Sequence, residues 1–171
     1  MDIQTAKLLA SYNASANMDM NKIIHELSDS QWKMEFLGFF KSIQSLCNHL
    51  YIADFVWLRR FSGLRSFTYI EHKIFSEDIN FGMVVVNSIS EYEIKRKGLD
   101  GVISLFAADL NEKDFSSDLT YKDSGGNEHK RNFGGLVLHM FNHQTHHRGM
   151  ISLYLENLGI ENDFNSLFEI L

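Results

Sequence analysis

The sequence predicts an all-α fold: a four-helix bundle with one long crossover connection, a small β-hairpin and a short C-terminal helix. Apolar residues recur at helical spacing over four long stretches, which is typical of amphipathic helices that bury one face. Proline is absent from all 171 residues, so no stretch is broken by one. The second and third stretches are separated by a long connection, which is typical of a bundle with a crossover.

The first two predicted helices occupy the N-terminal third of the chain. The first covers residues of about 2–27, and Ser28 followed by Gln31 suits a capping box at the start of the next. The second is expected over about 31–61, where it would be roughly 45 Å long, and it ends at Ser62-Gly63. Because this helix carries apolar residues around much of its circumference, it also predicts association into a homodimer.

The middle of the chain is predicted to cross from one helix to the next. Residues 62–87 hold aromatic and charged side chains without a firm period, which indicates a long connection. Ser88 with Glu91 then suits the start of a third helix over about 89–110.

A hairpin and the last long helix complete the bundle. Residues 119–131 are predicted to form the hairpin, because 122–127 combine Asp, Ser, Gly and Asn in a turn-forming cluster. Asn132 suits the cap of a fourth helix over about 133–158. Residues 162–171 are expected to form a short last helix.

Composition points to one soluble domain inside the cell. The chain is 44% hydrophobic, enough for a full-sized core, so we expect a single domain over residues 1–171. Its formal net charge is -6 and its one short basic run is Lys95–Lys97, which disfavours binding to nucleic acid. The single cysteine, Cys47, fits a reducing compartment and is expected to be buried and inert. Without a signal peptide or an apolar run that could span a membrane, we expect a cytoplasmic protein with no membrane partner.

Histidines gather in one short segment. Four of the eight fall within residues 139–147, and His143 and His147 stand four residues apart, on one face of a helix. The rest of that ridge is apolar or aromatic: Leu136, Met140, Ile151, Tyr154 and Leu158. Such a stripe packs into a core, so the pair should point inward, where an imidazole needs a partner. Buried histidines satisfied by carbonyls or by each other, a solvated histidine-rich face and a metal site are the three interpretations.

A metal site needs a third ligand from another helix. His139 lies about 12 Å along the helix axis from His147, so one ion cannot bind both and His143 at distances of about 2 Å. His49 is the best candidate, because it interrupts an apolar ridge in the same way as the pair does. Solvated side chains are the simpler interpretation for three others, which lie near a helix end or in connections: His25, His72 and His129.

Two segments together resemble a known family. His49 is followed by Asp54 and Trp57, and residues 142–149 read Asn-His-x-x-His-His-Arg-Gly. This combination resembles the DinB/YfiT-like superfamily, and the hairpin and helix lengths extend the resemblance over nearly the whole chain. The resemblance implies a four-helix bundle whose divalent metal is bound by the three matching histidines, His49, His143 and His147. It departs at Met150, where the family usually has glutamine, so a polar role at that position is not carried over.

The resemblance also bears on activity. Members of the superfamily include thiol-dependent transferases and isomerases that use low-molecular-weight thiols. It therefore implies a small-molecule substrate, with a low-molecular-weight thiol as a candidate cosubstrate, and it adds to the expectation of a homodimer.

The chemistry of such a site has three alternatives. Neutral imidazoles leave positions open around an ion, as in catalytic sites, and suit a divalent transition metal, zinc or nickel foremost. The ion could hold a thiol as thiolate, which gives S-transferase chemistry. It could equally supply metal-bound hydroxide for a hydrolase, and a dimeric metal-binding protein without turnover is the third alternative.

The sequence identifies no general base. Asp54 lies about 140° around the helix from the candidate ligand, and could orient a histidine of another helix or form a salt bridge. Arg148 could bind an anionic substrate group or tie two helices together. Trp57 is expected in the core, and His139 and His146 beside the site or on the surface.

Overall fold

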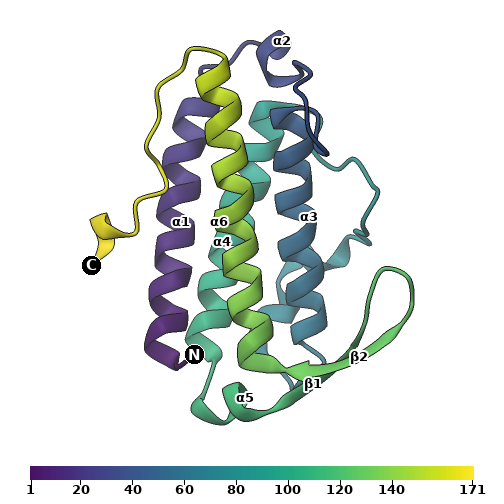
Figure 1. The fold of residues 1–171 in the computed structure, drawn as a ribbon. Helices are drawn as coiled ribbons and strands as arrows, with labels where there is room; N and C mark the ends of the chain where they lie inside the picture. The colour runs from purple at the N-terminus through teal and green to yellow at the C-terminus, as the bar shows by residue number, and fades with distance from the viewer.

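The computed structural model describes residues 1–171, the side chain of Glu169 excepted, and shows four long helices side by side (Figure 1). These are α1 (Ile3–His25), α3 (Ile43–Phe61), α4 (Ile89–Asp109) and α6 (Phe133–Asn157). Helices α1 and α3 each pack against α4 and α6, so they occupy opposite corners of the bundle. The predicted four-helix bundle is confirmed, and none of the described helices is long and apolar enough to cross a membrane.

Side-chain caps begin the helices where the sequence indicates. The Ser88 side chain accepts a hydrogen bond from the Glu91 amide at the start of α4, and the Asn132 side chain accepts one from the Gly135 amide at the start of α6. Each bond satisfies an amide that has no partner within its helix. The capping box at Ser28 is also present, but it begins only α2 (Asp29–Trp32), a helix of one turn.

The prediction of one continuous helix over 31–61 is therefore wrong in its first part. Residues 33–42 form an irregular loop, and α3 begins after it at a second capping box, in which the amides and side chains of Ser42 and Ser45 bond reciprocally at 3.0 and 3.1 Å. Within the loop Gly38 has a φ of +156°, which residues with a side chain rarely adopt. Helix α3 is thus about 28 Å long, rather than about 45 Å.

The apolar surface of α3 is covered within the chain. Its fully buried apolar side chains include Leu46, Leu50, Phe55 and Leu58. The argument for a homodimer from this helix therefore loses its basis. Association of two copies stays a prediction that rests on the family resemblance.

Short elements connect the long helices. The crossover between α3 and α4 contains two 3₁₀ turns, η1 (Thr68–Glu71) and η2 (Lys73–Ser76). An unpredicted helix, α5 (Glu112–Ser116), precedes the expected antiparallel hairpin of β1 (Asp118–Lys122) and β2 (Glu128–Asn132). The C-terminal helix is only one 3₁₀ turn, η3 (Phe168–Ile170), which lies outside α1 (Figure 1).

The core has two apolar clusters with a band of buried polar side chains between them. One cluster lies towards the hairpin, the other towards α2. On α6, for example, the first cluster ends at Phe141 and the second begins at Ile151. The buried polar side chains come from all four long helices: Asn13, Asn17, Asp54, Arg96, Asp100, Gln144, His147 and Arg148. The candidate site lies at the level of this band.

Candidate metal centre

The structure brings the three candidate ligands together. His49 from α3 and His143 and His147 from α6 each offer one ring nitrogen, and these atoms all lie within 4.8 Å of one another. The His143 Nε2 atom is 3.0 Å from His49 Nε2 and 3.1 Å from His147 Nε2. Ligands at about 2.0–2.1 Å on a tetrahedral ion are separated by roughly 3.3 Å. The three side chains could therefore hold one ion with little movement.

Burial keeps the three imidazoles neutral. His147 is buried, and His49 and His143 are half-buried. Burial, with a smaller contribution from the neighbouring histidines, lowers the pKa of each of the three from 6.5 to about 4. At neutral pH the rings are therefore uncharged, which is the form that binds a metal.

Packing orients the rings in place of hydrogen bonds. The Nδ1 atoms of His143 and His147 are buried and have no hydrogen-bond partner among the described residues, whereas the second ring nitrogen of a metal-binding histidine ordinarily donates to an oxygen. The Phe40 ring instead packs 4.4 Å from the His49 ring and 5.3 Å from the His147 ring, centroid to centroid. The Tyr154 hydroxyl donates to the Phe40 carbonyl at 2.7 Å and fixes the loop that supplies this ring.

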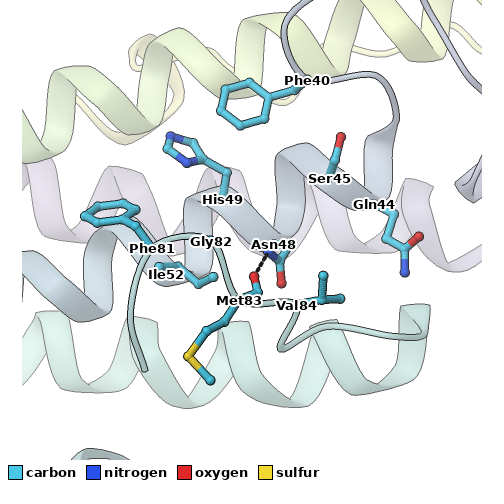
Figure 2. Close-up of a pocket in the computed structure, with 10 residues that line it drawn as sticks. All are labelled: Phe40, Gln44, Ser45, Asn48, His49, Ile52, Phe81, Gly82, Met83 and Val84. Atoms are coloured by element: carbon cyan, nitrogen blue, oxygen red, sulfur yellow. Dashed lines mark hydrogen bonds between the residues drawn. The ribbon is translucent and has the colours of Figure 1, made fainter. Parts of the chain in front are cut away.

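The crossover connection forms the other wall of the site. Asn48, next to His49, donates to the Met83 carbonyl at 2.9 Å and accepts from the Val85 amide at 2.8 Å. A pocket of about 330 Å³ lies between α3 and this segment. Figure 2 shows the Phe40 and Phe81 rings flanking His49 at this pocket. His49 is thus the ligand candidate that faces this largely apolar space.

Comparison with known proteins places the chain in a family. The sequence model of the DinB family matches residues 1–164. The chain belongs to the DinB family. It is also similar to the protein DinB of Bacillus subtilis (strain 168), with 27% identity over 152 residues that cover 88% of this chain and 84% of that protein.

In this DinB-family chain, Asp54 and Arg148 form contacts between distant segments of the fold. Asp54 accepts from the fully buried Arg96 at 2.9 Å, so the salt bridge between helices is the correct interpretation and the role in orienting a histidine is not observed. Arg148 ties helices together, because it donates to Asn13 on α1 and to Asn165 in the C-terminal segment.

The expectations that Trp57 belongs to the core and that Cys47 is buried are also confirmed. Trp57 is 8% exposed and belongs to the core, while Met150 packs against the second apolar cluster and not in a polar site. Cys47 is fully buried, and burial raises the pKa of its thiol far above the usual range. A buried protonated thiol is a poor nucleophile or ligand.

The other histidines lie outside the cluster. The His139 ring stacks edge-on against Trp57 and lies 6.1 Å from the His143 ring, whereas His146 is exposed. Three more contact residues outside the cluster: His25 contacts Glu93, His129 contacts Asp123, and His72 accepts from the Ile74 amide. Among the described residues, the cluster thus consists of one histidine from α3 and two from α6.

Two parts of the site were not anticipated from the sequence. Phe40 lies in a segment that was predicted as helix, and Asn48 carries no signal that it fastens the crossover beside the histidines. The one available hint for Phe40 is the Ser42-x-x-Ser45 spacing, a weak variant of a capping box.

Proposed function

We propose that this DinB-family chain is a divalent-metal-dependent enzyme of the thiol S-transferase type, with zinc or nickel held by His49, His143 and His147. The observation that carries the proposal is the convergence of three neutral ring nitrogens, one of which belongs to His49 in the wall of a largely apolar pocket. Histidine-only ligation suits a transition metal and leaves its charge uncompensated by carboxylates. A bound ion would supply Lewis acidity that holds a thiol as thiolate.

The protein's own residues prepare the site for this. The lowered pKa values mean that no imidazole has to lose a proton before it binds metal at neutral pH. The Phe40 and Phe81 rings cover His49 and limit the access of water. Electrostatic interactions are stronger in such a partly desolvated place.

The pocket walls favour a thiol over water as the activated group. None of the ten residues that line the pocket is Asp or Glu, so a carboxylate base is missing at this wall. A free thiol loses its proton near pH 8.5, roughly, and bulk water only near about 15.7. Activation of a thiol therefore requires less help from a neighbouring base than activation of water.

The test is the conjugation of a thiol to chlorodinitrobenzene by purified protein. Metal-free protein, protein loaded with zinc or nickel, and two loaded variants are compared. We expect thiol consumption only with metal, loss of at least about tenfold in His49→Ala, and retention in His139→Ala, whose ring is outside the cluster.

Two outcomes would contradict the thiol chemistry in different ways. Metal-dependent hydrolysis of a generic ester or amide, without thiol conjugation, would identify a hydrolase. Stoichiometric metal binding without either reaction, over a panel of thiols, would identify a metal-binding protein without turnover.

A further inference from the structure

Arg60 lies on the same face of α3 as His49. The two residues are eleven positions apart, which is close to three helical turns and about 16 Å along the axis. Long side chains on a helix lean towards its N-terminus, so the guanidinium of Arg60 is directed back towards His49. The ridge that carries the candidate metal ligand therefore also carries a cation.

The guanidinium of Arg60 is surrounded by aromatic rings. It lies 4.8 Å from the ring of Trp57, 5.3 Å from that of Tyr121 and 5.9 Å from that of Phe81. Within the part of the chain that the structure describes, it has no hydrogen-bond or ion-pair partner, although it is half-buried and burial lowers its pKa. A partly desolvated cation of this kind favours an anionic ligand.

Its neighbour Arg59 shows the ordinary alternative. Arg59 pairs with Asp78 at 3.2 Å and donates to the carbonyls of Phe75 and Glu77 at 3.2 and 2.7 Å. These bonds fasten the crossover to α3. The guanidinium of Arg59 is thus occupied by contacts that stabilise the fold, whereas that of Arg60 has no such partner among the described residues.

The cation is close enough to share a ligand with the histidines. The Arg60 guanidinium is 5.9 Å from the Phe81 centroid, which is itself 6.3 Å from the His49 centroid, so guanidinium and His49 ring are at most about 12 Å apart. Phe81 lines both the pocket at His49 and a second pocket of about 380 Å³ at Arg60. One extended small molecule could pass along Phe81 from one to the other.

Asp123 acts on Arg60 through its charge, which opposes the lowering of the Arg60 pKa by burial, but it forms no ion pair with Arg60. Asp123 lines the second pocket, but its carboxylate accepts from His129 at 2.9 Å and from the Gly125 and Asn127 amides, each at 2.9 Å. Lys122 from the same hairpin adds a further positive charge to this pocket. The charged side chains that line this pocket are three cations and one carboxylate: Arg59, Arg60, Lys122 and Asp123.

We propose that Arg60 is a substrate-anchoring residue, which binds the carboxylate of a small anionic thiol whose sulfur lies at the three histidines. This inference rests on the proposed function and assigns the class of cosubstrate: an elongated thiol with a carboxylate remote from its sulfur. The aromatic rings around Arg60 hold the guanidinium in place and pack along the apolar part of the ligand.

The test uses protein loaded with cobalt(II), whose thiolate charge-transfer absorption reports sulfur at the metal without any turnover. Mercaptooctanoate is titrated against mercaptooctanol, which has the same chain without the charge. We expect the carboxylate thiol to bind on the order of tenfold more tightly than the alcohol. Arg60→Gln should abolish that preference and leave the affinity for the alcohol unchanged.

Matched variants separate this anchor from a general effect of charge or folding. Lys122→Gln removes a positive charge from the same pocket and should keep most of the preference. Arg60→Lys retains the charge and should restore part of it. Thermal melts confirm that each variant is folded before titration.

The outcomes distinguish the anchor from the proposed function. Equal affinity for both thiols in the unaltered protein, or an equal loss of both in Arg60→Gln, would overturn the anchor while leaving the thiol site intact. A larger loss of preference in Lys122→Gln than in Arg60→Gln would also overturn it. Absence of the thiolate absorption with every thiol would refute the proposed thiol chemistry itself.

Discussion

The buried ion pair of Arg96 allows a sharp test of what holds the bundle together at the level of the site. Arg96 is fully buried on α4; its Nη1 atom donates to Asp54 at 2.9 Å and its Nη2 atom lies 2.9 Å from an oxygen of Asp100. Arg96→Met keeps a long, unbranched side chain but leaves two buried carboxylates without their cation. Removal of one partner from such a pair destabilises a protein by about 3–5 kcal/mol.

The pH dependence of this loss can be worked out from the two carboxylates. Burial already raises the pKa of Asp54 from 3.8 to about 6, and Arg96 opposes this shift, so its removal raises the value further. When a carboxyl group has a higher pKa in the folded than in the unfolded state, the protein loses stability as the pH rises from the unfolded-state pKa to the folded-state pKa. The largest cost per carboxylate is about 4 kcal/mol at pH 7 and less than half of that at pH 5, where less free energy is needed to protonate it.

We therefore expect Arg96→Met to be much less stable than the unaltered protein at pH 7 and closer to it at pH 5, in urea unfolding followed by circular dichroism. Arg65→Met is the control, because Arg65 also bridges two carboxylates, those of Asp109 and Asp114, but is 30% exposed. It should lose clearly less than Arg96→Met, because Arg65 and Asp109 are partly exposed to water and Asp114 keeps its bond from the Asn111 amide. Similar losses in the two variants, or a loss in Arg96→Met that is the same at both pH values, would refute the reasoning.

Three further outcomes are expected. Asn48→Ala should speed amide exchange at Val85, because it removes the acceptor of that amide and the bond to the crossover, at a cost of about 1–3 kcal/mol; unchanged exchange would mean that other contacts hold the segment. Gly38→Ala should lower the melting temperature, since a Cβ there would lie 2.5 Å from the Tyr154 hydroxyl and φ is +156°; an unchanged melt would show that the loop adapts freely. Metal-free protein should lose stability as pH falls from about 6.5 to about 4, because the pKa values of the three histidines are about 4 in the folded protein and 6.5 ordinarily. In urea unfolding, His143→Gln should make this dependence on pH less steep. An equally steep dependence would contradict the lowered pKa of His143.

The sequence predicts most of the architecture and the three histidines, because both depend on local spacing. His143 and His147 share a helix face whatever the helix packs against. The apolar residues on that face indicate that both side chains point into the bundle. Caps such as Ser88 and Asn132 likewise act within one turn and are visible in the chain itself.

What the sequence does not predict depends on contacts between distant segments. The loop before α3 interrupts an apolar pattern that suits a helix, and its position is fixed by the bond from Tyr154 on α6. The partner of Asp54 lies on α4, 42 residues away, and no local pattern identifies it. Of the aromatic rings around Arg60, Trp57 lies one turn before it on α3, but Phe81 of the crossover and Tyr121 of the hairpin are brought to it only by the fold.

The most direct measurement is the calorimetric titration of metal-free protein with zinc, carried out in parallel on His49→Ala and His139→Ala. If His49, His143 and His147 form one site, the unaltered protein and His139→Ala bind one ion per chain tightly, and His49→Ala loses that binding. Both variants have one histidine fewer, so a difference between them reports position and not the number of imidazoles. Tight stoichiometric binding in His49→Ala, or equal weakening in both variants, would contradict the account.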